Sequence, residues 1–145
     1  MTSIIQQLSE PYGNLAYREV GQGDPLVLIH GVGMQSAAWG PQIEHFGQSM
    51  HVIALDMPGH GDSSPLPTTA ELPDYVSWLF AALTALDTGP VNLAGHSMGA
   101  LIAGGFAVSY PQLTRRVALL NGVHKRSASA RAAVEARSTQ INAGE

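Results

Sequence analysis

The chain has 145 residues, of which 45% are apolar and 12% charged, and this is enough to bury the core of one α/β domain. It has no cysteine, which excludes disulfides, a thiolate nucleophile and a cysteine-based metal site, and its six histidines show no paired metal-ligand spacing. Since no apolar stretch approaches a membrane span and residues 1–10 lack the pattern of a signal peptide, we expect a cytoplasmic protein with no membrane partner.

The net charge is −4, and the acidic and basic residues are unevenly distributed along the sequence. Through Leu113 the only basic residue is Arg18, against nine acids, whereas six of the seven basic residues follow Thr114. A basic C-terminal segment can indicate nucleic-acid binding, but this one lacks interleaved aromatic residues and the rest of the chain is acidic. We therefore expect a solvated helix surface or a contact to acidic structure that this sequence lacks, and no nucleic-acid partner.

The N-terminal part predicts strands. Residues 4–8 and 14–20 have the pattern of a hairpin that turns around Pro11, Tyr12 and Gly13. The continuous apolar run of residues 26–29 is typical of a strand buried on both faces. It leads into the glycine-rich segment His30-Gly31-Val32-Gly33-Met34.

A short helix is predicted next. We expect Ser36 to cap it and Gly47 to end it, with one apolar face formed by Trp39, Ile43 and Phe46.

The rest of the chain alternates between strands and helices. A strand is expected over residues 52–55, followed by a helix that ends near Leu86 and is closed by residues 87–89. The apolar face of this helix consists of Val76, Leu79, Phe80, Leu83 and Leu86. Strands at 90–94 and 117–120 flank a helix over 98–110 that Pro111 stops. This alternation predicts a mostly parallel sheet with helices on both faces.

The pentapeptide Gly95-His96-Ser97-Met98-Gly99 is the most informative motif of the chain. It reads G-x-S-x-G and lies between a predicted strand and a predicted helix, so that its serine sits at the apex of a sharp turn. Such a turn forces Ser97 into a sparsely populated backbone conformation, at a cost of roughly 1–3 kcal/mol. Gly95 and Gly99 are needed because a Cβ at either position would collide across the bend. The motif therefore predicts a nucleophilic serine held above the sheet.

The glycine-rich segment after the preceding strand supports this interpretation. A loop of this kind can turn backbone N–H groups toward one point, which acyl transfer requires because its tetrahedral intermediate carries an oxyanion. One donor is the residue after the nucleophile, Met98, and the best candidate for the other is Val32. We expect Gly31, Gly33 and His96, which flank these groups, to contribute to substrate binding.

At these residues the sequence resembles the α/β-hydrolase superfamily. Three ordered pieces carry the resemblance, namely residues 30–33 with Trp39 downstream, residues 56–63 (Asp-Met-Pro-Gly-His-Gly-Asp-Ser), and residues 95–99. The resemblance implies Ser97 as nucleophile, Val32 and Met98 as oxyanion-hole donors, and a scaffolding role beside the pocket for the loop that begins at Asp56. It implies no cofactor and no metal.

Two other function classes compete with the hydrolase. Residues 31–36 are nearly the G-x-G-x-x-G fingerprint of a dinucleotide fold, and Asp56 follows at the distance of a ribose-binding carboxylate. However, Ser36 replaces the third glycine, and such a fold gives no reason for the motif around Ser97. The second alternative is a receptor or ligand-binding protein that keeps the hydrolase fold and has lost catalysis.

The resemblance also implies parts that this sequence lacks. Family members have eight strands and carry the acid and the histidine after the serine, whereas six strands are predicted here. We interpret residues 1–126 as the N-terminal portion of a hydrolase core and residues 127–145 as the start of a lid. Three explanations are open for the missing parts. The chain is the N-terminal piece of an enzyme nicked in its lid, whose C-terminal portion is a separate polypeptide; or it is a truncated protein; or it is a natural half-hydrolase. We prefer the first, because exposed segments are preferred sites of proteolysis.

For the whole protein the expected reaction is hydrolysis of a small, largely apolar carbonyl substrate through an acyl-enzyme on Ser97. Esters, lactones and a carbon–carbon bond of a vinylogous diketone all remain open as substrates.

Overall fold

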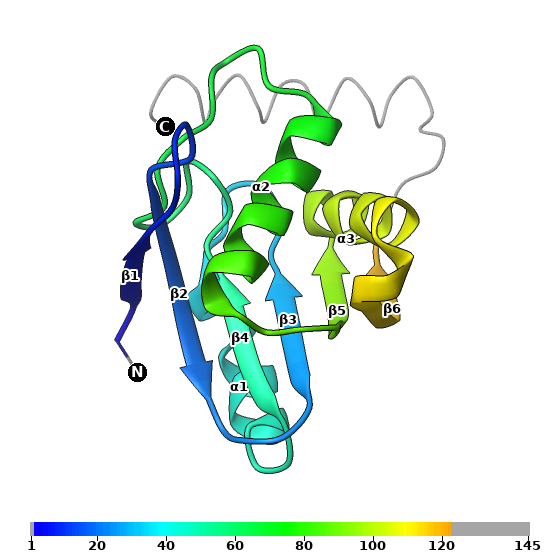
Figure 1. Ribbon diagram of the computed structural model, residues 1–145. Helices are drawn as coiled ribbons and strands as arrows, with labels where there is room; N and C mark the ends of the chain where they lie inside the picture. Colours follow the sequence, from blue (N-terminus) through cyan, green and yellow to red (C-terminus); the bar gives the residue numbers. More distant parts are fainter. Residues whose placement is uncertain (1, 123–145) are drawn as a thin grey trace.

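The computed structural model describes residues 2–122 as one six-stranded sheet with helices on both faces (Figure 1). The strand order is β1-β2-β4-β3-β5-β6. The strands are β1 (Ile4–Gln7), β2 (Asn14–Val20), β3 (Pro25–Ile29), β4 (His51–Leu55), β5 (Val91–His96) and β6 (Thr114–Leu120).

The predicted mostly parallel sheet is confirmed. β1 and β2 form the expected antiparallel hairpin, and β2 is also antiparallel to β4, whereas β4, β3, β5 and β6 run parallel to one another. The carboxyl ends of these four strands therefore lie at one edge of the sheet, where ligands bind in open α/β folds. The loops that follow β3, β4 and β5 all begin at this edge.

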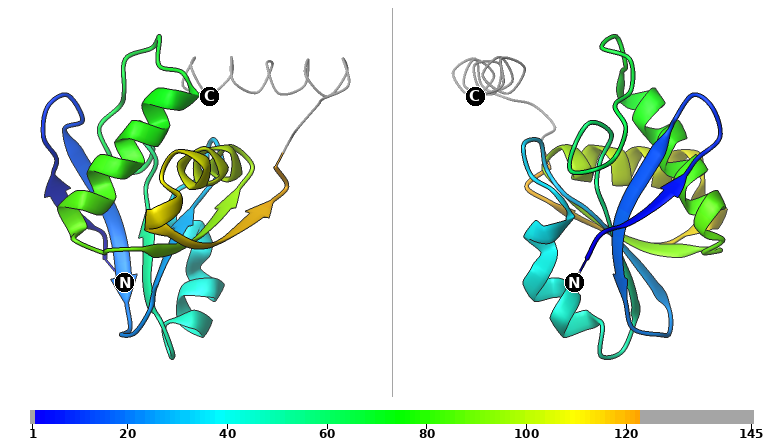
Figure 2. Two further views of the ribbon diagram at one scale, coloured as in Figure 1. Left: turned by 45° about the vertical axis from the view of Figure 1, so that its right-hand side comes forward. Right: turned by 90° about the vertical axis from the view of Figure 1, so that its left-hand side faces the viewer.

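Two layers of helices cover the sheet. The helical segments are η1 (Ser36–Trp39), α1 (Gly40–Phe46), α2 (Leu72–Leu86), α3 (Met98–Ser109) and η2 (Pro111–Leu113). Figure 2 shows α2 and α3 on one face and α1 on the other. Alternate residues of the central strands serve the two layers. Val27, Ile29 and Leu55 belong to the core under α2 and α3, whereas Leu28 and Ala54 belong to the smaller core under α1.

The first helix differs from its prediction. It begins with a 3₁₀ turn whose first residue is Ser36, so the N-cap position falls on Gln35; the Ser36 hydroxyl accepts a hydrogen bond from Arg18 Nε at 3.1 Å. Trp39 and Ile43 are buried as expected, but Phe46 is 38% exposed. Phe46 lies in the same α-helix as the buried Ile43, at its last residue, and its ring contacts that of His45 edge-on with centroids 4.9 Å apart. Gly47 ends the helix as predicted.

The buried face of α2 also differs from its prediction. Trp78 is fully buried in it, whereas Phe80, which was expected there, is 38% exposed and stacks on Tyr110 with ring centroids 4.6 Å apart. Phe80 thus packs along the rim between α2 and the end of α3 instead of under the helix. The helix ends at Asp87 in a left-handed conformation with φ 51°.

One edge of the molecule is apolar and exposed. β6 pairs only with β5 among the described residues, and its Val117, Leu119 and Leu120 are 41%, 53% and 45% exposed. The predicted lid segment, residues 127–145, and the basic residues from Lys125 onward lie outside the described residues. Within residues 2–122 no helix is long and apolar enough to cross a membrane.

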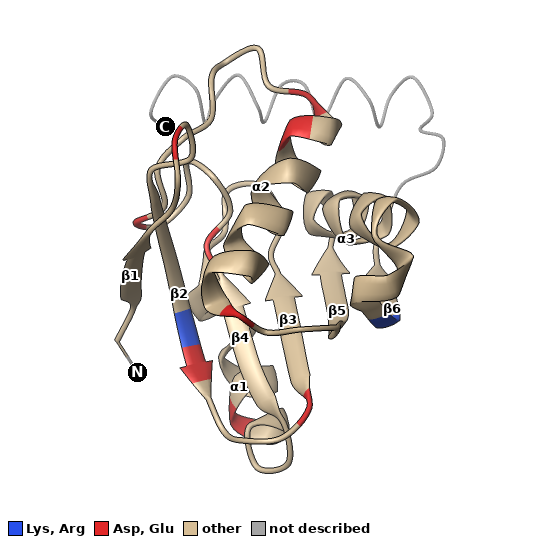
Figure 3. Ribbon diagram, in the orientation of Figure 1, with Lys and Arg blue, Asp and Glu red and all other residues tan. Residues whose placement is uncertain are grey.

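The charges of the described part are sparse (Figure 3). Basic residues occur on β2 and at the beginning of β6, where Arg115 Nη1 lies 3.1 Å from Asp24 Oδ1. Arg115 thus pairs with an acid of this chain, whereas the basic segment was expected to form a solvated helix surface or to contact acidic structure that the sequence lacks. The pair is exposed, so its contribution to stability is about 0–1 kcal/mol.

Candidate active site

Ser97 lies at the turn between β5 and α3, at the carboxyl edge of the sheet. Its φ of 56° and ψ of −117° place it outside the regions that a side chain ordinarily allows. A conformation of this kind costs about 1–3 kcal/mol and persists only where the surroundings enforce it. Here the Ser97 N–H donates to the Leu120 carbonyl at 2.9 Å, and α3 begins at the next residue.

The glycines on either side of Ser97 make this turn sterically feasible. A Cβ at Gly95 would overlap the carbonyl oxygen of Gly99, and a Cβ at Gly99 would overlap the carbonyl oxygen of Ile29. The prediction that neither position tolerates a side chain is therefore confirmed. The second contact also shows that α3 begins directly against the end of β3.

The glycine-rich loop after β3 lies against this turn. A Cβ at Gly31 would be 3.2 Å from Ser97 Cβ and 3.3 Å from His96 Nδ1. Residues that are 66 positions apart in the sequence are thus in contact, and the structure brings together the loop and the motif that sequence analysis had assigned to one site.

The loop itself is a tight turn. The Met34 N–H donates to the Gly31 carbonyl at 3.2 Å, and Gly33 has φ 81°, the value of the third residue of a type II β-turn. Gly33 is therefore required by the backbone conformation. Within residues 2–122, the Val32 and Met98 N–H groups, the two expected oxyanion donors, have no hydrogen-bond partner.

His30 supports this loop from below. It is 1% exposed, its Nδ1–H donates to the Gly31 carbonyl at 2.8 Å, and its Nε2 accepts the Met57 N–H at 3.0 Å. One ring nitrogen donates and the other accepts, so the imidazole is neutral. Burial lowers the pKa of His30, and the neighbouring His60 lowers it further, while the bond to Gly31 and the charge of Asp56 act in the opposite direction.

The loop after β4 holds the other end of the same segment. The buried Asp56 accepts the Ser36 N–H at 2.7 Å and the Asp62 N–H at 3.4 Å, and Gly61 packs so close to its carboxylate that no side chain fits there. Asp56 is therefore occupied by backbone donors and does not face a ribose. This removes the residue on which the dinucleotide interpretation depended.

His60, in the same loop after β4, also contacts the loop after β3. Its Nε2 accepts the Gly33 N–H at 3.0 Å, its Nδ1–H donates to the Pro58 carbonyl at 3.0 Å, and its ring centroid is 5.2 Å from that of His30. Sequence analysis assigned no contact to His30 or His60. Their link was not predicted, and the signal for it was the position of residues 56–63 after the strand that pairs with β3.

His96 lies between Ser97 and the end of β6. The Asn121 amide Nδ2 and His96 Nε2 are 3.1 Å apart, while the His96 Nδ1 is buried next to Gly31 without a partner in residues 2–122. That Gly31, Gly33 and His96 bind substrate stays a prediction. Within the described residues there is also no group of three or more side chains that could hold a metal ion.

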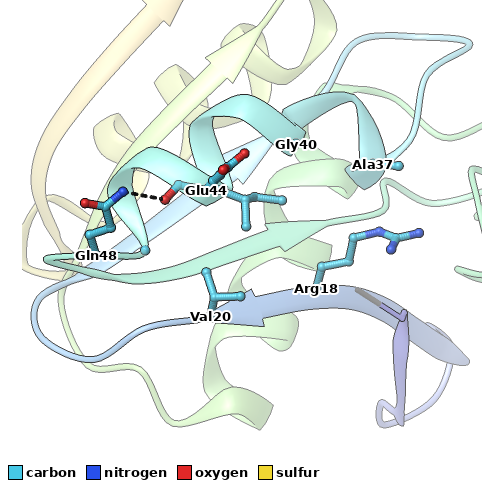
Figure 4. Close-up of a pocket in the computed structure, with 8 residues that line it drawn as sticks. Arg18, Val20, Ala37, Gly40, Glu44 and Gln48 are labelled. Carbon is cyan, nitrogen blue, oxygen red and sulfur yellow. Dashed lines mark hydrogen bonds between the residues drawn. The ribbon is translucent and has the colours of Figure 1, made fainter.

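The molecule has hollows away from this site. A groove with a volume of about 540 Å³ lies between β2 and α1 and is bordered by Arg18, Val20 and Glu44 (Figure 4). Its lining contains none of the predicted site residues. The candidate site remains the region at the carboxyl edge of the sheet where the turn at Ser97 and the loop after β3 meet.

Comparison with known proteins identifies the family to which this fold belongs. The family model described as alpha/beta hydrolase fold matches residues 24–140. The chain is 56% identical over 128 residues to (E)-2-((N-methylformamido)methylene)succinate hydrolase of Acinetobacter baylyi, covering 88% of this chain and 49% of that protein. It is 33% identical over 130 residues to 2-(acetamidomethylene)succinate hydrolase of Mesorhizobium japonicum, covering 90% and 46%.

Solved structures show the same similarity. The crystal structure of E-2-(acetamidomethylene)succinate hydrolase superposes with a TM-score of 0.85 at 30% identity, over 94% of this chain and 51% of that one. A thermophilic esterase from Thermogutta terrifontis gives a TM-score of 0.76 at 25% identity, over 90% and 49%. The chain spans about half the length of these relatives. It belongs to the α/β-hydrolase fold family.

Proposed function

We propose that this chain, together with a C-terminal portion, forms a serine hydrolase that works through an acyl-enzyme on Ser97; we call this assembly the complete enzyme. One observation carries the proposal. The strained turn at Ser97 contacts the loop after β3, and the N–H groups of Val32 and Met98, one from each segment, have no partner within residues 2–122. Donors of this kind stabilise the oxyanion of a tetrahedral intermediate.

In the proposed reaction the Ser97 Oγ attacks the substrate carbonyl and its proton passes to a general base. The intermediate collapses, the leaving group takes up the proton, and water then hydrolyses the acyl-enzyme and restores the hydroxyl. His30 and His60 do not serve as the base, because both nitrogens of each ring are engaged with backbone groups. We propose that the base and its orienting acid come from the C-terminal portion.

The relatives suggest a substrate. Two of them are named for hydrolysis of a methylenesuccinate that carries an N-methylformamido or an acetamido group, and one of these is 56% identical to this chain. We propose that the complete enzyme cleaves the amide carbon–nitrogen bond of such an N-acylaminomethylene dicarboxylate. This is the same carbonyl chemistry as that expected for an ester or lactone, with an enamine nitrogen as leaving group, but two carboxylates replace the largely apolar character expected of the substrate.

Recognition of two carboxylates requires cationic or hydrogen-bonding groups. The basic residues of the described part are Arg18, Arg115 and Arg116, and the latter two begin β6, at the opposite end of the strand from the Ser97 turn. We therefore propose that residues outside 2–122 hold the carboxylates.

The exposed side of the sheet is consistent with a C-terminal portion that docks there. On the α1 side a groove of about 710 Å³ runs across β3, β5 and β6, and its apolar lining includes Leu28, Ala94 and Leu120. The free edge of β6 continues this surface. An exposed apolar strand edge promotes self-association. Residues 1–145 produced alone should therefore aggregate, and co-expression with a C-terminal portion should restore a soluble, active assembly.

The decisive test is Ser97→Ala in the complete enzyme. We expect turnover of 2-(acetamidomethylene)succinate to fall by at least about 10³-fold, as loss of a nucleophile does in other hydrolases. Ser109→Ala, on the exposed end of the same helix, is the matched control and should be fully active. A fluorophosphonate probe should label Ser97 in the complete enzyme. Undiminished turnover by Ser97→Ala would disprove the proposal, and an unlabelled wild-type serine would favour a non-catalytic binding protein.

A further inference from the structure

The two peptide units that flank Val32 are each held by a histidine. The Gly31 carbonyl, which accepts from His30 Nδ1–H at 2.8 Å, and the Val32 N–H belong to the same peptide unit. In a trans peptide these two groups point in opposite directions, so that holding the oxygen fixes the direction of the N–H. The next peptide unit carries the Gly33 N–H, which donates to His60 Nε2 at 3.0 Å.

The bond to His60 requires one form of the ring. The Pro58 carbonyl is only an acceptor, so Nδ1 carries the proton, and the Gly33 N–H is only a donor, so Nε2 carries the lone pair. His60 also contacts the ring of His30, at 5.2 Å between centroids. The Pro58 and Met57 bonds anchor both rings to the loop after β4.

The hydrogen bond between the Gly33 N–H and His60 affects which type of turn the loop adopts. Type I and type II turns differ in the orientation of their central peptide, and here the central peptide joins Val32 to Gly33, whose φ is 81°. Glycine itself adopts both signs of φ readily, so its identity does not select one state. Rotation of the central peptide would withdraw the Gly33 N–H from His60 and leave the Val32 backbone fixed on one side only.

We propose that His60 is a positioning residue for the oxyanion loop. By accepting the Gly33 N–H it keeps the turn in its type II form, and together with His30 it holds Val32 with its N–H directed toward the reacting carbonyl. This inference rests on the proposed function. In this role His60 contributes to stabilisation of the transition state and does not contact the substrate.

The test compares His60→Phe, which keeps the ring but has no acceptor, with His60→Gln, whose amide oxygen reaches to about the position of Nε2. In the complete enzyme with 4-nitrophenyl acetate, we expect His60→Phe to lower kcat roughly tenfold with KM within about twofold, less than the 10²–10³-fold loss for removal of a donor itself. His60→Gln should recover most of the activity. Affinity for phenylboronic acid, which forms a tetrahedral adduct with an active serine, should follow kcat/KM.

His45→Phe makes the same change at an exposed histidine of α1 and should leave kcat and KM unchanged. If His60→Phe fails to fold, His60→Asn, whose shorter side chain does not reach Gly33, takes its place. An unchanged kcat, an effect on KM alone, or an equal loss in the Phe and Gln variants would overturn the role of His60. Ser97→Ala is assayed in parallel, because turnover that survives it refutes the proposed function, whereas Ser97-dependent turnover that ignores His60 refutes only this inference.

Discussion

The two segments that meet at the candidate site are held in place by different means. The turn at Ser97 is fixed by close backbone packing, since Gly95 and Gly99 lie where any side chain would overlap a carbonyl oxygen. The loop after β3 is fixed by polar side chains, because His30, His60 and Asp56 bind its backbone groups. A side chain that overlaps backbone atoms can be accommodated only if the backbone moves, whereas a lost hydrogen bond can be replaced by one to water. We therefore expect the turn to be the more fragile of the two toward substitution.

The largest expected effect is that of a single methyl group at the turn. Gly99→Ala should destabilise the complete enzyme by about 3 kcal/mol or more, because the new Cβ meets the Ile29 backbone, which belongs to a central strand and cannot move aside. Urea unfolding measures the change. The control is Gly104→Ala in the same helix, where the nearest atoms to a Cβ are Leu119 methyl groups at 3.8 Å.

Because Gly104 has room and a helical conformation, its replacement should be neutral or stabilise by up to about 1 kcal/mol. Equal effects of the two substitutions would show that the turn at Ser97 is not sterically enforced.

An intermediate effect is expected where a charged side chain holds the loop. Asp56→Asn keeps the shape but turns one acceptor into a donor that faces backbone N–H groups, so it should cost about 1–3 kcal/mol. Asp62→Asn, with an exposed carboxyl, is the matched control and should change the free energy of unfolding by less than about 0.5 kcal/mol. Amide hydrogen exchange at Ser36 should accelerate in Asp56→Asn only. A silent Asp56→Asn would mean that Asp56 does not hold the loop.

The smallest effect is a dependence on pH. Since burial lowers the pKa of His30 in the folded chain, the unfolded chain binds a proton as the pH falls below about 6.5 while the folded chain does not. Stability is therefore greatest above this pH and decreases below it, by at most about 1.4 kcal/mol per pH unit for one proton.

His30→Gln removes this titration. Although it lowers stability throughout, the difference between wild type and variant in the free energy of unfolding should shrink from pH 7.5 to pH 5. A difference that stays constant would contradict the assignment of the proton to His30. His60 and Asp56 are the titratable groups that face this ring, and they are unchanged in the comparison.

The turn at Ser97 and the loop after β3 also differ in how far apart in the sequence the residues that determine them lie. The turn at Ser97 was predictable because its requirements lie within five consecutive residues, and the strand and helix on either side have clear apolar patterns. The parallel sheet followed from the alternation of strands and helices. The amino acid sequence by itself thus determined the fold class, the family and the position of Ser97 at a strained bend.

Only the tertiary structure decided how the loop after β3 is held. His60 is 27 residues from Gly33 in the sequence, and the two meet because β3 and β4 pair in parallel and their loops leave the same edge of the sheet. The same applies to Asp56, whose carboxylate accepts the Ser36 N–H from 20 residues away in the sequence, and to Phe46, which is 38% exposed although it follows the buried Ile43 by three residues in one α-helix. Periodicity reports which face of an element is apolar. Which polar groups from different elements meet depends on the packing of those elements against each other.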